Sequence, residues 1–421
     1  MSRVPTRSAL GSDRRGAFEL GLLALQVPLT LSVSYLLGLL LAARSERRRA
    51  SAEGSPLAGA PLRLVVLVPA HDEAAVIGQT IEALRACPYP EDSLRIVVVA
   101  DNCSDATAAI AAVAGAEVWV RSDHERRGKG FALAWALERL QESEDPFAGV
   151  VFVDADCRAS PNLLLAADRR LREGATALQV DYVAGNPEDS PASALRFAAF
   201  AVGDSVRFLG KERLRLSCGL VGTGMAFDRG LLARNPWTAT GLVEDREFHM
   251  RLVLAGERVE FVPEASVSQA VPTSLAASSS QQARWEMGKV QLVRRWSGRL
   301  IRSGLTSRDL DRLHAGLEPL VPPQSVIAIG GSGGVAAGLL TRSRPLLALS
   351  ALTIIAQTAY VLGGLRLVGA PAYVYRALLS APALIGNKLL LYSRLATGRG
   401  PTSWVRTERE TPRAAAKEAP A

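Results

Sequence analysis

Two aspartates one residue apart end an apolar run in the stretch VVFVDADCRAS, and their chemistry suits a metal ion. Asp154 and Asp156 lie on the same side of an extended segment, because alternate residues share a face. Carboxylates this close repel each other unless a cation lies between them. The spacing suits Mg²⁺ or Mn²⁺ held by one or two carboxylates and by substrate phosphates. The alternative is a strand end with solvated aspartates.

A lysine between two glycines, in RRGKGFALAWAL, precedes a predicted helix. A helix N-terminus together with a lysine can hold an anion, although a flexible turn is the simpler interpretation. Only five of the 49 basic residues of the chain are lysines. Because arginine has replaced lysine so widely, the retention of a lysine at position 129 favours a functional role for Lys129.

Three further acids lie where they could act on a substrate. Asp101 ends the apolar run VVVAD and could hydrogen-bond a nucleotide base. Glu244 and Asp245 open an amphipathic helix in GLVEDREFHMRL, and a carboxylate near an acceptor hydroxyl can serve as a general base. Acidic residues are also favoured at helix starts by the helix dipole, so capping remains an alternative for this pair.

The stretch SQQARWEMGK combines a glutamine, an arginine and a tryptophan. Arg284 could pair with phosphate oxygens, and Trp285 could stack on a sugar face beside Gln281. An interfacial helix whose Arg and Trp lie at the lipid headgroups is the alternative.

These residues follow an alternating pattern of short apolar strands and helices that begins near Leu62. Such alternation predicts βαβ units and a mostly parallel sheet. Ligands bind such sheets at the carboxyl ends of the strands. Three predicted strands end in PAHDE, ADNCSD and DAD, so we expect all three to open onto one crevice.

Composition indicates a membrane protein. Hydrophobic residues make up 48% of the 421-residue chain, and Ala17 to Ala43 carries a single charge, Glu19. This apolar run is long enough to cross a bilayer and too long for a cleaved signal peptide. The chain has a net charge of +8, and its basic residues cluster beside apolar segments. Aromatic residues make up only 5% of the chain, and this combination disfavours nucleic-acid binding. Four scattered cysteines without a CxxC pair indicate reduced thiols rather than a zinc site or disulfides.

The predicted organisation has eight parts. In chain order they are a polar N-terminal segment 1–16, a transmembrane anchor 17–43, a linker 44–61, a catalytic domain 62–282, interfacial amphipathic helices 283–316, two transmembrane helices within 317–370, an interfacial or third membrane helix 371–407, and a disordered tail 408–421. The charges and prolines in 373–395 favour a helix lying on the membrane. The basic cluster Arg44–Arg49 predicts a multi-pass protein of the inner (cytoplasmic) membrane with its catalytic domain in the cytosol.

The ordered set VPAHDE, VVVADNCSDAT, RGKGFAL, VFVDADCRASPN, GTGMAF, VEDREFHMRL and QQARW resembles the membrane-bound family 2 glycosyltransferases, a cellulose- and hyaluronan-synthase-like superfamily with DxD, ED and QxxRW motifs. It spans about Leu64 to Trp296. The resemblance implies an α/β fold with a GT-A type, Rossmann-like nucleotide-sugar-binding domain, a mostly parallel central sheet, and N- and C-terminal transmembrane and interfacial helices.

The resemblance also implies roles for individual residues. Pro69, His71 and Glu73 match a stretch that borders the nucleotide, in which Asp72 replaces the usual Asn. Asp101 matches the acid that reads the base, and Asp154 and Asp156 match the metal-binding DxD motif, with Lys129 adding charge. Asp245, preceded by Glu244, matches the catalytic base. Gly222 and Gly224 match a segment that lines the acceptor pocket, and Gln281, Arg284 and Trp285 match QxxRW, which cradles the diphosphate and the acceptor end.

The implied reaction is metal-dependent, inverting transfer of a hexosyl-type sugar from a nucleoside-diphosphate sugar, with a preference for UDP, to a membrane-associated lipid or glycan. The cofactor is Mn²⁺ or Mg²⁺, and an oligomer or export partner could complete a pore. QxxRW favours a processive polysaccharide synthase, whereas the few predicted spans favour single transfers. A nucleotidyltransferase would need a basic, glycine-rich loop where PAHDEAAV is acidic, and a catalytically inactive export scaffold would be expected to have lost its acids.

Overall fold

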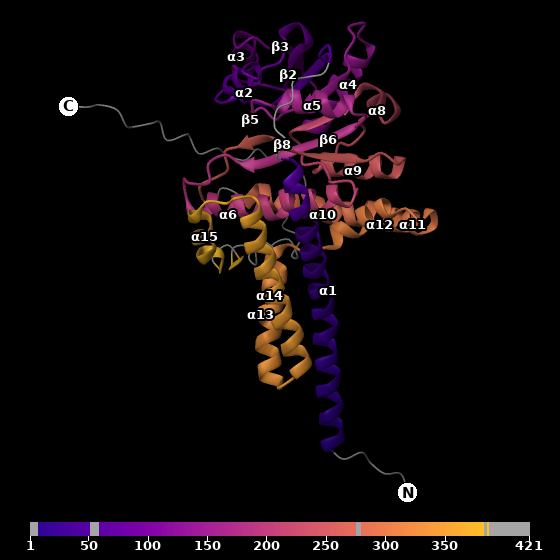
Figure 1. Ribbon diagram of the computed structural model, residues 1–421, viewed down its shortest axis with the longest axis vertical. Coiled ribbons are helices and arrows are strands. Elements are labelled where there is room, and N and C mark those ends of the chain that lie inside the picture. The colour runs from indigo at the N-terminus through magenta and orange to yellow at the C-terminus, as the bar shows by residue number, and fades with distance from the viewer. Residues whose placement is uncertain (1–6, 51–58, 275–278, 383–384, 387–421) are drawn as a thin grey trace, which may run out of the picture.

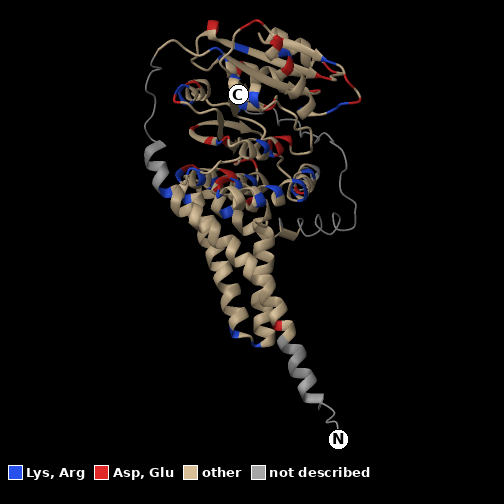
Figure 2. Cartoon of the chain, turned by 90° about the vertical axis from the view of Figure 1, so that its right-hand side faces the viewer, with Lys and Arg blue, Asp and Glu red and all other residues tan. Residues whose placement is uncertain are grey.

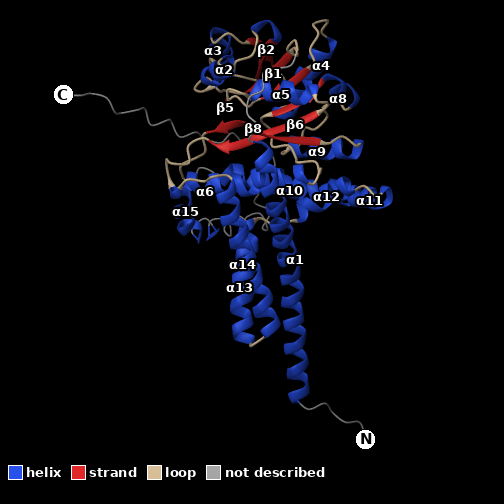
Figure 3. Ribbon diagram, viewed as in Figure 1, coloured by secondary structure: helices blue, strands red, loops and turns tan. Residues whose placement is uncertain are grey.

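The computed structural model describes residues 7–50, 59–274, 279–382 and 385–386. A domain that contains the sheet lies at one end of the molecule, and three long helices extend from it (Figure 1). These are α1 (Arg7–Ala50), α13 (Gln324–Thr341) and α14 (Arg344–Leu367). All strands lie in the domain, and the extension is helical (Figure 3).

One eight-stranded sheet forms the centre of the domain, in the order β3-β2-β1-β4-β7-β6-β8-β5. The pairs β1–β2, β1–β4, β2–β3 and β6–β8 are parallel, and the pairs β4–β7, β6–β7 and β5–β8 are antiparallel. The mostly parallel α/β sheet predicted from the sequence is therefore confirmed. The strands are β1 (Leu64–Ala70), β2 (Leu94–Asp101), β3 (Glu117–Arg121), β4 (Gly149–Phe152), β5 (Cys157–Ala159), β6 (Ala177–Ala184), β7 (Met225–Asp228) and β8 (Val259–Gln269).

Helices cover both faces of this sheet. Along β1, Val66 and Val68 face a core with α2 and α5, whereas Val65 and Leu67 face a second core with α4, α8 and α9. Because both faces are buried, the strands are continuous apolar runs rather than alternating ones. The covering helices are α2 (Ile77–Arg85), α3 (Thr107–Val113), α4 (Lys129–Glu142), α5 (Leu163–Arg172), α8 (Arg229–Arg234) and α9 (Glu244–Ala255), with a short turn η1 (Glu91–Ser93).

A layer of shorter helices separates the sheet from the three long helices (Figure 1). Lys and Arg gather in this layer, while the long helices below it are almost free of charge (Figure 2). Ser190 caps α6 through a capping box followed by Pro191, which fixes where the layer begins. Its members are α6 (Pro191–Phe200), η2 (Ala201–Ser205), α7 (Val206–Arg213), α10 (Ser279–Leu292), η3 (Val293–Ser297), α11 (Gly298–Ser307), α12 (Leu310–Leu317), η4 (Glu318–Leu320), α15 (Ala372–Ala377) and η5 (Leu378–Ser380).

Three helical segments are long and apolar enough to cross a membrane: Ala17–Arg44, Gln324–Thr341 and Arg344–Leu367. They coincide with the three segments that the sequence predicts. Inside the bundle, Gln26 Nε2 donates to Thr353 Oγ1 over 2.8 Å. Gly334 lets the helices approach closely, because a Cβ there would lie 2.2 Å from Ser350 Oγ. Small residues and interhelical hydrogen bonds of this kind hold helices together in lipid.

α1 extends beyond the predicted anchor at both ends. The sequence predicts a polar segment for residues 1–16 and an anchor for 17–43, and α1 already begins at Arg7. No proline lies between Arg7 and Pro28, so the helix extends beyond the apolar run. The linker predicted for 44–61 is likewise helical as far as Ala50.

The C-terminal prediction concerns the segment 373–395. Within this segment, α15 lies against α6 in the layer of short helices (Figure 1). The predicted tail 408–421 lies outside the described residues.

Candidate active site

The carboxyl ends of β1, β2 and β4 meet at one edge of the sheet, because these strands are parallel neighbours. Asp154 and Asp156 follow β4 at this edge, as predicted. The backbone N–H of Asp154 donates to Thr223 Oγ1 over 3.1 Å, which fixes the start of the acidic turn. Thr223 lies 69 residues further along the chain, between the two glycines of GTGMAF, and was not itself singled out from the sequence.

Lys129, at the start of α4, reaches these carboxylates. Its Nζ lies 2.5 Å from Asp154 Oδ1 and 3.9 Å from Glu244 Oε1, and it donates to the Gly222 carbonyl over 2.8 Å. Gly222 has φ +90°, and a Cβ there would lie 3.2 Å from Lys129 Nζ and 3.5 Å from Asp245 Oδ2. The structure thus brings Lys129, Asp154, Gly222 and the first residues of α9 into one cluster.

Burial and mutual charge govern protonation in this cluster. Burial tends to lower the pKa of Lys129, but the charges of Asp154 and Glu244 outweigh it and raise the pKa. Burial and the charge of Asp156 raise the pKa of Asp154 against the opposing effect of Lys129. Burial, with Asp245 beside it, raises the pKa of Glu244 to about 7 despite Lys129. Glu244 can therefore gain or lose a proton near neutral pH.

Asp156 is held by a residue that the sequence analysis missed. Gln269 Nε2 at the end of β8 donates to Asp156 Oδ2 over 2.6 Å, and Gln269 Oε1 accepts a hydrogen bond from the Tyr182 hydroxyl. The antiparallel pairing of β5 with β8 places Gln269 opposite Cys157. A contact between residues 113 positions apart leaves no local signal in the sequence.

The oxygens of Asp154 and Asp156 and the sulfur of Cys157 lie within 4.8 Å of one another, so this group could hold a metal ion. Burial raises the pKa of the Cys157 thiol well above its usual value, with the two aspartates adding to the effect. A protonated thiol is a poor ligand, whereas carboxylates suit Mg²⁺ and Mn²⁺. The donor set therefore fits a hard divalent cation held by the two aspartates.

Asp101 ends β2 in a buried ion pair with Arg121 of β3, at 2.5 Å. His71 Nδ1 lies 2.8 Å from the Asp101 carbonyl oxygen, which ties the residues after β1 to the end of β2. Arg121 was not singled out from the sequence, although the parallel register places it directly opposite Asp101. The pair leaves Asp101 with a carboxylate that is largely neutralised and fixed in orientation.

The loop after β1 is also tied to the next helix. Pro69 lies within β1, in register with Val99 of β2. Asp72 has φ +54° and accepts from the backbone N–H of Ser104 over 2.6 Å, which lowers the pKa of Asp72. The backbone N–H of Glu73 donates to Thr107 Oγ1 over 2.7 Å. The aspartate found in place of the usual asparagine thus joins the loops that follow β1 and β2.

The remaining predicted residues are Gly224 and three residues of α10. Gly224 is packed in the sheet, where a Cβ would lie 2.4 Å from Val180 Cγ2, so its small size is required for packing. Gln281, Arg284 and Trp285 lie on α10, and Trp285 packs against Phe200.

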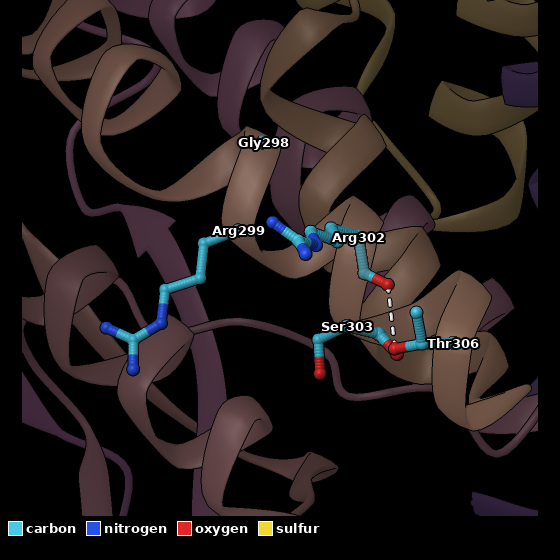
Figure 4. Close-up of a pocket in the computed structure, with 5 residues that line it drawn as sticks. All are labelled: Gly298, Arg299, Arg302, Ser303 and Thr306. Atoms are coloured by element: carbon cyan, nitrogen blue, oxygen red, sulfur yellow. Dashed lines mark hydrogen bonds between the residues drawn. The ribbon is translucent and has the colours of Figure 1, made fainter.

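A hollow of about 560 Å³ lies elsewhere, on α11 (Figure 4). None of the site residues described above lines it, so it is separate from the carboxylate cluster.

The sheet topology and the acidic edge define a GT-A type, Rossmann-like α/β protein. Consistent with this fold, the structure is similar to that of the mannosyltransferase PcManGT from Pyrobaculum calidifontis, solved in complex with GDP-Man and Mn²⁺. The TM-score is 0.50 at 19% sequence identity, and the match covers 80% of this chain and 99% of that one.

Residues 61–288 match the model of the glycosyltransferase like family 2, and the chain belongs to that family. A probable glycosyltransferase of Sulfolobus acidocaldarius is 24% identical over 270 residues, which cover 62% of this chain and 57% of the relative. The probable glycosyltransferase YdaM of Bacillus subtilis is 26% identical over 245 residues, which cover 55% of this chain and 56% of the relative. The chain thus spans less than three fifths of the length of these relatives.

Proposed function

We propose that this family 2 glycosyltransferase transfers a hexosyl-type sugar from a nucleoside-diphosphate sugar, preferably a UDP-sugar, to a lipid or glycan acceptor at the membrane. The observation that carries the proposal is the convergence of Lys129, Asp154, Glu244 and Asp245 at one edge of the sheet. The same edge carries the aspartate pair that suits a divalent cation.

The donor would lie along this edge. Pro69, His71, Glu73 and Asp101 lie at the ends of β1 and β2, where they would border the nucleoside. Lys129 would contribute positive charge to the diphosphate. Bound Mn²⁺ or Mg²⁺ on Asp154 and Asp156 would neutralise the diphosphate and help it to leave.

Asp245 is proposed as the general base. The acceptor hydroxyl oxygen forms a bond to the anomeric carbon, and its proton passes to the Asp245 carboxylate. The bond from that carbon to the diphosphate breaks, and its electron pair leaves with the nucleoside diphosphate. Attack from the side opposite the leaving group inverts the anomeric centre. Glu244 would tune the base, because its own charge near neutral pH depends on its neighbours.

The acceptor is proposed to approach from the membrane side. Gly222 lies against the base, and Gln281, Arg284 and Trp285 on α10 lie in the layer above the three long helices. Exposed leucines on those helices, such as Leu25 and Leu340, would face lipid. We propose an inner-membrane protein that crosses the bilayer three times, with its catalytic domain and basic layer in the cytosol.

The test is donor turnover by the full-length protein in detergent with added lipid. UDP-, GDP- and dTDP-sugars are offered with Mn²⁺ or Mg²⁺, and release of nucleoside diphosphate is measured. Asp156→Asn and Asp245→Asn are matched in size to the native side chains, and Arg63→Gln, on the far surface of the domain, is the control. We expect metal-dependent release from one donor, lost by at least about 100-fold in both aspartate variants.

Three other outcomes would change the proposal. Release that survives both substitutions would place the active site elsewhere. No release with any donor, from protein that is folded and supplied with lipid acceptors, would favour an inactive scaffold of an export complex. A long polymer rather than a single added sugar would identify a processive synthase, which QxxRW favours.

A further inference from the structure

We propose that the hollow on α11 binds the headgroup of an anionic phospholipid. The hollow lies on α11, which projects to one side of the molecule (Figure 1). It is lined by Gly298, Arg299, Arg302, Ser303 and Thr306. Because nothing in this set belongs to the candidate active site, the inference does not depend on the donor or on the reaction.

The two arginines make the hollow cationic. Arg299 and Arg302 are exposed, lie about one turn apart and extend to the same side of α11 (Figure 4). Within the described part of the chain, neither forms an ion pair, whereas Arg295 lies 3.3 Å from Glu247 and Arg312 lies 3.3 Å from Asp309. Two guanidinium groups without acidic partners suit a phosphate, because each presents a planar fork of donors.

A hydroxyl group completes the anion site. Ser303 Oγ accepts a hydrogen bond from Arg312 Nη1 over 3.2 Å, so the serine proton is left to donate. Arg312, from α12, is itself paired with Asp309 and holds that hydroxyl in place. The Thr306 hydroxyl instead donates to the Arg302 carbonyl over 3.0 Å and shapes the wall of the hollow.

The surroundings identify the anion as a lipid rather than a free phosphate. Leu305, three residues after Arg302, is 63% exposed, and Leu310 at the start of α12 is 74% exposed. The α11–α12 pair projects sideways at the level where the long helices meet the layer of short helices (Figure 1). Exposed leucines beside exposed arginines match the boundary between acyl chains and headgroups.

Lipid binding here would also restrain the catalytic helix. Leu300 of α11 and Trp296 of η3 pack in one buried cluster with Met250 and Val253 of α9. α9 begins at Glu244 and Asp245. A headgroup that steadies α11 would therefore steady the helix that carries the proposed base.

The experiment measures lipid binding to the full-length protein in neutral detergent by native mass spectrometry. Phosphatidylglycerol and phosphatidylcholine are titrated separately, and inorganic phosphate is added as a competitor. The variants are Arg299→Gln, Arg302→Gln, their double, and the double Arg299→Lys/Arg302→Lys. Arg63→Gln/Arg234→Gln removes two exposed charges from the far surface of the catalytic domain and is the charge-matched control.

We expect one tightly bound phosphatidylglycerol that phosphatidylcholine does not replace and millimolar phosphate does not displace. Each glutamine substitution should weaken it by about fivefold and the double by about 25-fold, since a basic residue near an anionic surface contributes about 1 kcal/mol. The lysine pair should bind with an affinity between those of the native chain and the double glutamine variant, because it keeps both charges but loses the planar forks. Undiminished binding in the double glutamine variant, equal loss in the control, or displacement by phosphate would each overturn the proposal. If the double variant does not fold, the single variants decide.

Discussion

Replacing Lys129 by methionine should tighten Mn²⁺ binding to the donor-free protein, even though it removes a proposed substrate-binding residue. Lys129 Nζ lies 2.5 Å from Asp154 Oδ1 and 3.9 Å from Glu244 Oε1. A metal ion on Asp154 would share that carboxylate with the ammonium group. The lysine thus competes with the metal for the same negative charge. Without the lysine, the carboxylates lack a neutralising cation and should bind the metal more tightly.

The size of the effect follows from Coulomb's law. Two cations on one carboxylate lie about 4–5 Å apart, where a charge of +2 and a charge of +1 repel by about 2 kcal/mol in bulk water and by several times more at an effective dielectric constant of about 20. The Lys129 and Asp154 side chains are 22% and 30% exposed, so solvent screens them and the lower figure applies. It corresponds to about 20- to 30-fold tighter binding.

The assay is a Mn²⁺ titration of the full-length protein, with free Mn²⁺ measured by electron paramagnetic resonance. Lys129→Arg keeps the charge and should leave the affinity close to that of the native chain, while Asp156→Asn should abolish specific binding. Nucleotide-sugar binding should weaken in Lys129→Met, because the diphosphate loses a cationic contact. Mn²⁺ affinity that is unchanged or lower in Lys129→Met would refute the reasoning that the lysine and the metal share Asp154.

Three other substitutions test the site and its supports. Gln269→Ala removes the hydrogen bond that orients Asp156 and should weaken Mn²⁺ binding by about 10- to 100-fold in the same titration. Gly224→Ala would place a Cβ 2.4 Å from a valine side chain at φ +64° and should cost about 2–4 kcal/mol in thermal unfolding; Gly203→Ala, with no atom within 4 Å, is the control and should be neutral. Burial, with Lys211 nearby, lowers the pKa of His249 to about 3, so the unfolded chain takes up the proton first as the pH falls below about 6.5. Stability should then fall by about 2 kcal/mol between about pH 8 and pH 5, and His249→Gln should flatten that slope.

The first half of the sheet could be predicted because its signals are local. Each of β1 to β4 is a short apolar run followed by a turn or helix signal, and parallel neighbours necessarily bring their carboxyl ends together. That rule alone places the residues after β1, Asp101 and the DxD turn at one edge. The order of these elements along the sequence therefore predicts most of the candidate site.

The second half depends on long-range pairing. β7 inserts antiparallel between β4 and β6, and β8 pairs with both β6 and β5. No periodicity distinguishes these partners, so Gln269 could not be recognised from sequence, and the contact of Thr223 with Asp154 could not be inferred from the GTGMAF motif alone. Arg121 is a different case. It is directly opposite Asp101 in a predicted parallel pair, so the register would have pointed to it had the pairing been followed residue by residue.

The long helices pack closely against the domain that contains the sheet. α1 packs on α7 so tightly that a Cβ at Gly210 would lie 2.4 Å from the Leu39 carbonyl oxygen. Lys211, also on α7, is almost fully buried, and its Nζ lies 2.7 Å from Glu318 Oε1. Glu318 is the first residue of η4, the turn that leads into α13. A buried ion pair of this kind is costly to break by removing one partner. The orientation of the catalytic domain on its helices is therefore fixed, and an acceptor that reaches Asp245 must approach at a defined height above them.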